Sequence, residues 1–221
     1  MNYSQVESQI INVAVVIPAM NEAEDIVDVV AGVALFCMPI VVDDGSNDNT
    51  AMLAELAGAF VVKHAVNLGY DAALESGLFK AIELGFEFAI TLDADGQHLP
   101  ETLLSFNAEL VAGADLVVGT REHYQRYSEA LFSVVGKFLW GIKDPLCGMK
   151  GYKLSHLEKF GHFDSYKSIG TEFALFCARS GLDIRNVPIT TKSRSGPSRF
   201  GSGLRPNLKI LRALILGLIN K

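Results

Sequence analysis

Short, continuous apolar runs alternate with longer segments of helical periodicity along the first half of this chain. The runs at residues 13–17, 40–42, 60–62, 86–92 and 116–118 are predicted strands, and residues 22–36, 69–84 and 100–111, with a shorter segment ending at residue 56, are predicted helices. Strands without polar alternation are typical of a sheet buried on both faces. The sequence therefore predicts an α/β fold with a mainly parallel central sheet flanked by helices.

Acidic residues follow two of the predicted strands directly. Asp43 and Asp44 come after the run at residues 40–42, and Asp93 and Asp95 come after the run at residues 86–92. In open α/β sheets, ligands bind beyond the carboxyl ends of the strands. Two acidic strand ends in one such domain predict a metal-assisted nucleotide site.

The second acidic group contains three oxygen donors at alternate positions, Asp93, Asp95 and Gln97. Alternate residues of an extended segment share one face, so their oxygens can converge on one cation. Oxygen ligands suit Mg²⁺ or Mn²⁺. His98 is either a further ligand or an ordinary loop imidazole.

The 221-residue chain carries a formal net charge of −6, but the charge is unevenly distributed. No Asp or Glu follows Asp183, whereas basic residues continue to the last position. An acidic body with a basic, apolar tail argues against general nucleic-acid binding and favours a local anionic partner, either a phosphate group or a membrane surface. The basic residues after Asp183 are Arg185, Lys192, Arg194, Arg199, Arg205, Lys209, Arg212 and Lys221.

Residues 204–221 combine basic side chains with apolar residues at helical spacing. We expect one domain over residues 1–203 and a basic amphipathic helix over residues 204–221. Such a helix can lie in the membrane interface, dock on the core or form a dimer contact. No apolar run is long enough to span a bilayer, and residues 1–11 lack the features of a signal peptide. The expected location is cytoplasmic, peripheral at the cytoplasmic face of the membrane.

Several motifs occur in a fixed order along most of the chain. They are Pro-Ala-Met-Asn-Glu at residues 18–22, Val-Asp-Asp-Gly-Ser at 42–46, Leu-Asp-Ala-Asp-Gly-Gln-His at 92–98, Val-Gly-Thr-Arg at 118–121, Asp-Pro-Leu-Cys-Gly at 144–148, Val-Pro-Ile at 187–189 and Gly-Pro-Ser-Arg-Phe at 196–200. This set closely resembles the family 2 glycosyltransferases, and within them the dolichol-phosphate mannose synthase-like branch of polyprenyl-phosphate glycosyltransferases. The resemblance implies a GT-A fold, a nucleotide-sugar donor and inversion at the anomeric carbon.

The resemblance also implies roles for individual positions. It places the metal at Asp95 and Gln97, and it makes Asp95 and Arg121 catalytic, with Arg121 contacting phosphate. Met20 stands where the family usually has an aromatic residue, so stacking on the base is replaced by a thioether contact. The positions implied to contact the nucleotide-sugar are Pro18, Ala19, Met20, Glu22, Val42, Asp44, Asp93, Ala94, Arg194 and Arg199.

Glu172 lies near the place where many family 2 enzymes carry a base that acts on a sugar hydroxyl. A hydroxyl acceptor needs such a base, whereas a phosphate monoester is already mostly ionised at neutral pH because its second pKa is about 6. With a lipid phosphate as acceptor, Glu172 would instead orient a sugar hydroxyl or a cation. A helix N-terminal carboxylate is the alternative interpretation.

The resulting hypothesis is an inverting, metal-dependent enzyme that moves a hexose, by resemblance mannose from GDP-mannose, to a polyprenyl phosphate such as dolichyl or undecaprenyl phosphate. UDP-glucose or a UDP-N-acetylhexosamine is an alternative donor. Two other functions stay open at this point. One is transfer to a glycan hydroxyl in cell-surface polysaccharide synthesis, and the other is a non-catalytic sugar-nucleotide-binding module.

Overall fold

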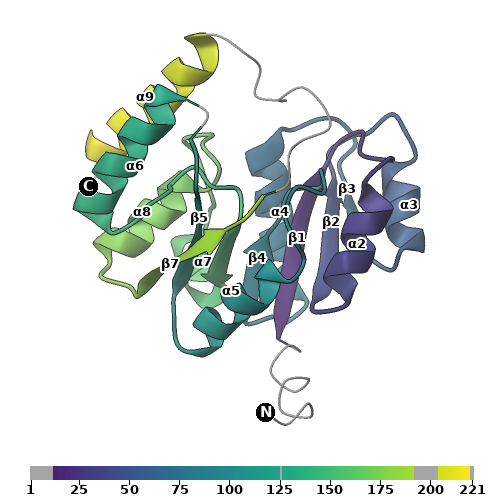
Figure 1. Cartoon of the computed structure of the whole chain (residues 1–221). Coiled ribbons are helices and arrows are strands. Elements are labelled where there is room, and N and C mark those ends of the chain that lie inside the picture. The colour runs from purple at the N-terminus through teal and green to yellow at the C-terminus, as the bar shows by residue number, and fades with distance from the viewer. Residues whose placement is uncertain (1–11, 125, 192–203, 220–221) are drawn as a thin grey trace.

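A seven-stranded sheet forms the centre of the computed structural model, which describes residues 12–124, 126–191 and 204–219. The strands lie in the order β3-β2-β1-β4-β6-β5-β7 (Figure 1). All the pairs are parallel except the two made by β6, so the predicted mainly parallel sheet is confirmed. The strands are β1 (Val13–Ala19), β2 (Met38–Asp43), β3 (Phe60–Lys63), β4 (Phe88–Thr91), β5 (Leu116–Arg121), β6 (Lys150–Lys153) and β7 (Ile184–Ile189).

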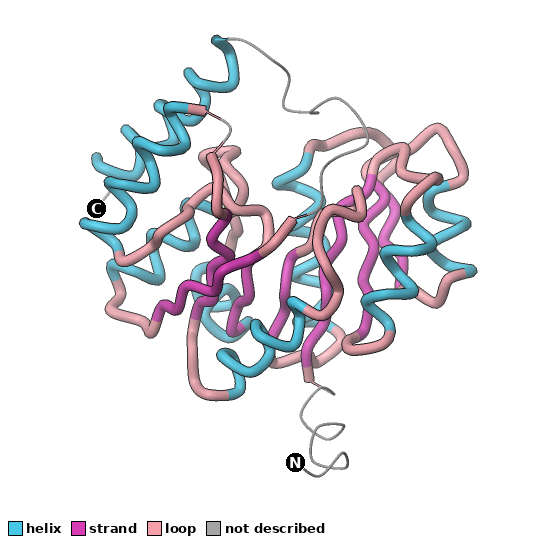
Figure 2. The backbone as a smooth tube through the Cα atoms, in the orientation of Figure 1, coloured by secondary structure: helices cyan, strands magenta, loops and turns pink. Residues whose placement is uncertain are grey.

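Helices cover both faces of this sheet (Figure 2). Val15 and Ile17 of β1 pack in the apolar core on the side of α2 (Ile26–Ala34) and α5 (Thr102–Val111). Ala14 and Val16 face the other way, into the core formed with α4 (Tyr70–Glu83), α7 (Leu154–Phe160) and α8 (Thr171–Arg179). This alternation follows from the two-residue side-chain period of a strand. The short helix α3 (Thr50–Leu56) lies beside α2 and β3.

The predicted end of the first strand at Pro18 is wrong, because β1 continues to Ala19. The Val16 carbonyl accepts a hydrogen bond from Leu92 N, on the β4 side, and the Ala19 carbonyl accepts one from Asp44 N, on the β2 side. Successive residues of a strand direct their backbone polar groups to opposite neighbours, so the backbone of Pro18 faces β4. The pairing of β1 with β4 has already ended at Thr91. A proline without an N–H is tolerated where no ladder partner remains.

The helix predicted at residues 22–36 is shorter than expected, since α2 spans Ile26–Ala34. Glu22 precedes it in a buried turn, where its N–H donates to Thr50 Oγ1 at 2.8 Å. The carbonyl of Glu22 accepts hydrogen bonds from the N–H groups of Asp25 and Ile26. Glu22 is therefore part of a loop-to-loop contact and not of the first helical turn.

A separate helical layer packs against α8. Helices α6 (Tyr127–Trp140) and α9 (Leu204–Ile219) lie side by side there (Figure 1). Phe132 and Leu146 bury themselves against Ala213 and Leu214 of α9. The predicted C-terminal helix is thus present and docks one face on the domain. Among the described helices, none has both the length and the apolar run that a bilayer span requires.

Candidate functional site

The carboxyl ends of β1, β2 and β4 meet at one edge of the sheet. From β1 the chain builds β2 and β3 on one side and β4 on the other, so the strand order reverses between β1 and β4. Such a reversal is where open α/β sheets bind ligands. The edge carries Met20 after β1, Asp44 after β2 and Asp93 after β4. The structure therefore brings the ends of three predicted motifs together.

The Asp44 carboxylate orders the loop that follows β3. Its oxygens accept hydrogen bonds from Leu68 N and Gly69 N, each at 2.8 Å, and His64 Nδ1 lies 2.7 Å from Oδ1. His64 Nε2 lies 2.9 Å from Ser76 Oγ on α4. Asp44 is thus buried and holds the loop after β3 in place. Its contact with the nucleotide stays a prediction.

Three loops are joined by further hydrogen bonds at this rim. Asn67 donates from its side-chain amide to the Met20 thioether. The Asn21 N–H donates to Ser46 Oγ at 2.9 Å, and Asn21 Oδ1 accepts from Asn47 N at 2.9 Å. Pro18, Ala19 and Glu22 line the same connection, whereas the Val42 side chain is fully buried against α4. Val42 as part of the pocket wall stays a prediction.

Asp93 is held by a residue that sequence reasoning did not single out. The Tyr70 hydroxyl donates to Asp93 Oδ1 at 2.6 Å. Burial and the Asp93 charge raise the pKa of Tyr70 well above its ordinary value, so the phenol stays a donor. His98 Nε2 lies 3.7 Å from Asp93 Oδ2, and Ala94 is buried beneath the turn. A Cβ on Gly148 would lie 2.9 Å from Asp93 Oδ2, so the backbone of that glycine packs directly on the carboxylate.

Asp95 and Gln97 lie in the turn that follows. Asp95 Oδ1 accepts a hydrogen bond from Gln97 N at 3.2 Å, which draws the two residues together. Both supply oxygen atoms, the donor type that Mg²⁺ and Mn²⁺ prefer, and both are only partly buried. Their chemistry therefore fits the predicted ion. Within the described part of the chain, no three or more His, Cys, Asp or Glu side chains gather into a metal cluster.

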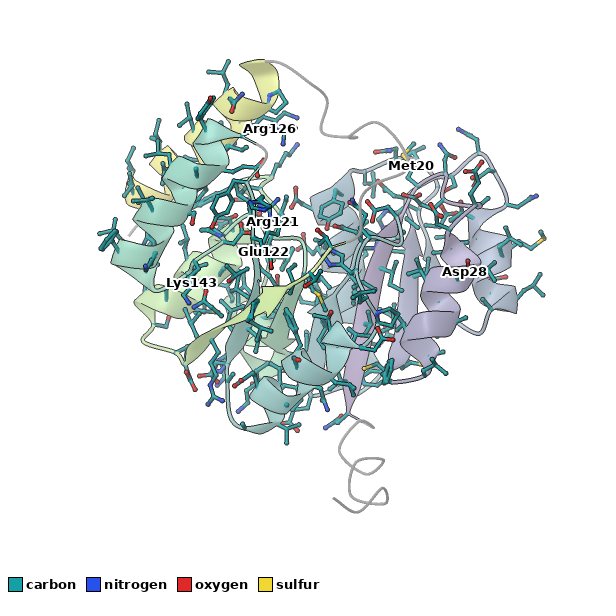
Figure 3. All side chains as sticks on the ribbon, in the orientation of Figure 1. Met20, Asp28, Arg121, Glu122, Arg126 and Lys143 are labelled. Atoms are coloured by element: carbon teal, nitrogen blue, oxygen red, sulfur yellow. The ribbon has the colours of Figure 1, made fainter. Side chains whose placement is uncertain are left out.

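Arg121 lies at the end of β5 and is held by a buried acid. Its Nε and Nη2 donate to the two Asp144 oxygens at 2.7 and 3.0 Å, and Nη2 also lies 3.4 Å from Glu129. Burial alone would lower the pKa of Arg121, but the Asp144 contacts outweigh it and raise that pKa. In Figure 3, Arg121 lies on the β5 side of this edge and Met20 on the β1–β2 side. Nη1 makes no hydrogen bond to another described residue, and the phosphate contact of Arg121 stays a prediction.

Lys150 and Glu172 are both held by contacts within the protein. Lys150 is fully buried and donates from Nζ to the Cys147 and Ile169 carbonyls, each at 2.7 Å. Glu172, in the first turn of α8, accepts a hydrogen bond from Ser165 N and lies 3.2 Å from His162 Nε2. Burial acts to raise the pKa of Glu172, but these hydrogen bonds outweigh it and hold that pKa below its ordinary value.

The predicted phosphate contacts Arg194 and Arg199 lie outside the described residues. The described chain before them ends at Thr191, which pairs with His98 in an antiparallel bridge. Thr191, the last described residue before them, therefore lies beside the turn that holds Asp95 and Gln97.

Comparisons with known proteins agree on the class of this domain. A family model described as "Glycosyl transferase family 2" matches residues 14–145. The polyprenol monophosphomannose synthase of Mycolicibacterium smegmatis is 31% identical over 86% of this chain and 82% of its own length. The UDP-N-acetylglucosamine–dolichyl-phosphate N-acetylglucosaminyltransferase of Methanococcus voltae is 28% identical over 91% of this chain and 94% of its own.

Solved structures show the same fold. Glucosyl-3-phosphoglycerate synthase from Mycobacterium tuberculosis, in complex with Mn²⁺, UDP-glucose and phosphoglyceric acid, superposes with a TM-score of 0.76 and 20% identity. The alignment covers 100% of this chain and 86% of that one. The same enzyme with Mg²⁺ and UDP gives a TM-score of 0.75 and 22% identity. The predicted GT-A fold is therefore confirmed.

Proposed function

Because the chain belongs to glycosyl transferase family 2, we propose that it is an inverting, metal-dependent enzyme that transfers a hexose from a nucleotide-sugar to a polyprenyl phosphate. Mannose from GDP-mannose is the donor we favour, since a relative that matches most of the chain is named as a polyprenol monophosphomannose synthase. A second relative is named for a UDP-N-acetylglucosamine donor and a dolichyl-phosphate acceptor. Both names share the lipid phosphate, and the donor sugar differs between them.

The single observation that carries the proposal is that β4 and β5 end at the same edge of the sheet, one on each side of β6. Asp93 and Asp95 follow β4 there, and Arg121 is the last residue of β5. Mg²⁺ or Mn²⁺ held by Asp95 and Gln97 would neutralise the charge that develops on the departing nucleoside diphosphate. Arg121 offers Nη1 to a phosphate while Asp144 fixes the plane of its guanidinium. An acceptor phosphate oxygen placed by Arg121 can then attack the anomeric carbon in line with the leaving group.

The state of Glu172 favours a phosphate acceptor over a hydroxyl. A general base works best when its pKa lies near the operating pH. The hydrogen bonds from Ser165 and His162 instead hold the pKa of Glu172 below its ordinary value, so this carboxylate is a weak proton acceptor. A phosphate monoester needs no deprotonation before it attacks. In this proposal Glu172 orders the start of α8.

An apolar, basic surface beside the site suits a substrate embedded in a membrane. The outward faces of α6 and α9 expose large apolar side chains, with Tyr127 98% and Phe138 80% exposed. The exposed charges on these helices are basic, because Glu129 is buried against Arg126 and α9 contains no acidic residue. We infer that this surface rests on an anionic membrane, which makes the enzyme peripheral. Its members are Tyr127, Leu131, Val134, Lys137, Phe138, Leu208, Lys209, Ile215, Leu218 and Ile219.

A matched pair of acceptors tests the proposal. Purified protein is given labelled GDP-mannose, Mn²⁺ and either polyprenyl phosphate or the corresponding polyprenol in detergent. We expect label in the organic phase with the phosphate and none with the alcohol, and we expect Glu172→Gln to retain most of the activity. Transfer to the alcohol or to a glycan hydroxyl, together with inactivity of Glu172→Gln, would contradict the proposal and support a hydroxyl acceptor.

A further inference from the structure

The connection between α7 and α8 passes through the left-handed region of backbone space. Lys167, Ile169 and Gly170 have φ values of 57°, 62° and 67°. Glycine adopts this region freely, but a β-branched residue such as Ile169 does so only under strain. A conformation of this kind persists only where the surrounding structure holds it.

Two charged side chains, the fully buried Lys150 and the partly buried Asp71, hold the carbonyl and the N–H of Ile169. Asp71 Oδ1 accepts a hydrogen bond from Ile169 N at 2.7 Å, and Lys150 Nζ donates to the Ile169 carbonyl at 2.7 Å. Lys150 has a second acceptor in the Cys147 carbonyl at 2.7 Å. Charge-assisted hydrogen bonds to both polar groups of one residue fix its backbone more firmly than neutral ones would.

Asp71 and Lys150 each lie next to a residue that contacts Asp93, the carboxylate expected to bind the donor. Asp71 follows Tyr70, whose hydroxyl binds Asp93 at 2.6 Å. Lys150 lies two residues after Gly148, whose backbone packs against the same Asp93. The first turn of α4 and the start of β6 therefore contact both the donor carboxylate and the strained connection.

The strained connection in turn sets the start of α8. Asp164 accepts hydrogen bonds from Ser168 N at 3.0 Å and Thr171 N at 3.1 Å, which tie the connection to the first residue of the helix. Arg212 of α9 donates to the Tyr166 carbonyl at 3.1 Å, which ties it to the helical layer of α6 and α9. The connection between α7 and α8 thus links the elements around Asp93 to the side of the site where Arg121 and α9 lie.

We propose that Asp71 and Lys150 are positioning residues, which hold Ile169 in its left-handed conformation. They thereby fix the position of the acceptor side of the site, the start of α8 and Arg121, relative to the donor side at Asp93. The inference rests on the proposed transfer reaction. Neither residue touches a substrate in this account. Both act through the Ile169 backbone on the connection and on the first turn of α8.

The hydrogen bond between the Ile169 N–H and Asp71 can be followed directly by NMR. Burial and the charge of Asp164 raise the pKa of Asp71 to about 6, against the opposing influence of the Ile169 N–H and Lys150. The titratable groups that face Asp71 are Lys150, Asp164 and Tyr70. An amide proton bonded to a carboxylate reports the ionisation of that carboxylate through its chemical shift. We therefore expect the Ile169 amide resonance to titrate with a midpoint near 6 and to lose this titration in Asp71→Asn.

Kinetics then separate positioning from general stability. In Asp71→Asn, we expect the KM for the acceptor to rise about tenfold or more, because the connection and the start of α8 lose a contact that holds them in place. The KM for the donor should change by no more than about twofold, because Asp93 keeps its hydrogen bond from Tyr70. Glu75→Gln is the matched control, a second carboxylate on α4 that makes no hydrogen bond or ion pair with the described residues of the connection. It should change neither constant.

A rescue variant makes the test specific to the strained residue. Glycine at position 169 takes the left-handed conformation without help, so adding Ile169→Gly to Asp71→Asn should restore much of the lost acceptor affinity. Adding Lys167→Gly, at an exposed position of the same connection with φ 57°, should restore nothing.

The proposal is overturned if the Ile169 amide does not follow Asp71, if both KM values rise together, or if Lys167→Gly rescues as well as Ile169→Gly. A wild-type protein that transfers no sugar to polyprenyl phosphate contradicts the proposed function instead. The amide titration needs no acceptor, so it still decides whether Asp71 holds Ile169.

Discussion

The Tyr70 hydroxyl lies 2.6 Å from Asp93 Oδ1 and joins the first turn of α4 to the end of β4. Asp93 therefore has a fixed orientation before any substrate arrives. Preorganised groups of this kind spare the reaction the cost of reorientation. The same turn of α4 also places Asp71 against Ile169, so one helix start organises two parts of the site.

Replacing Tyr70 with Phe should lower donor affinity about tenfold, because Asp93 loses one hydrogen bond and gains freedom. The free energy of unfolding should fall by only about 1–2 kcal/mol. Calorimetric titration with GDP or UDP in the presence of Mn²⁺ measures the first quantity, and urea denaturation measures the second. Tyr127→Phe, at a 98% exposed position, is the control. Unchanged donor affinity in Tyr70→Phe would contradict this role.

The position of Asp93 at the site could be predicted from the sequence, whereas that of Tyr70 could not. Asp93 and Asp95 follow directly after an apolar strand, so local order alone placed them at the binding edge. Tyr70 lies 23 residues before Asp93, and only the packing of α4 against β1 and β4 brings the two together. The Asn-Leu-Gly sequence before Tyr70 is typical of a turn, but nothing local connects that turn to Asp93.

The same limit applies to the second half of the chain. β6 is four residues long and contains Gly151 and two lysines, so neither strand period nor hydrophobicity marks it. The sequence shows Lys150 as a cation, but its complete burial beside the Ile169 carbonyl and the charges of Asp71 and Asp164 comes from tertiary packing. The parallel first half was predictable because its strands are uniformly apolar and bounded by turn residues.

Arg121→Lys should reduce kcat at least about tenfold, because a lysine cannot bind Asp144 through two hydrogen bonds and also present a planar edge to a phosphate. The loss of the bidentate pair should also lower the free energy of unfolding by about 1–3 kcal/mol. Steady-state transfer assays and denaturation curves measure the two effects. Arg185→Lys, in the exposed pairs with Asp183 and Glu109, serves as control. Equal kcat values for wild type and Arg121→Lys would exclude the proposed phosphate contact.

Asp71 should make the protein less stable as the pH rises from about 4 to 7. Its pKa is about 6 in the folded chain against an ordinary 3.8, so the folded state binds the proton more tightly than the unfolded state. Stability from this group is complete below pH 3.8 and is lost as the pH rises through 6. Relative to Asp71→Asn, the wild-type free energy of unfolding should fall by up to about 3 kcal/mol across that window. A constant difference between the two proteins would contradict the raised pKa.

Phe138→Glu should weaken binding to vesicles of phosphatidylglycerol by about tenfold or more, because it removes a large exposed apolar side chain and adds a negative charge. Co-sedimentation measures the change. Leu56→Glu, at a 78% exposed position on α3, is the matched control and should bind as the wild type does. The membrane contact is contradicted if the wild-type protein does not bind the vesicles. If Phe138→Glu then dissociates a dimer in analytical ultracentrifugation, the surface of α6 and α9 joins two copies of the chain.

The most direct test of the account is sugar transfer by the purified protein into an organic-extractable product. A panel of labelled GDP-mannose, UDP-glucose and UDP-N-acetylglucosamine is offered with polyprenyl phosphate and Mg²⁺ or Mn²⁺. The account predicts lipid-linked label from one donor, GDP-mannose before the others, which disappears on chelation and in Asp95→Ala. Tight donor binding without any lipid-linked label, or label that persists in Asp95→Ala, would contradict it.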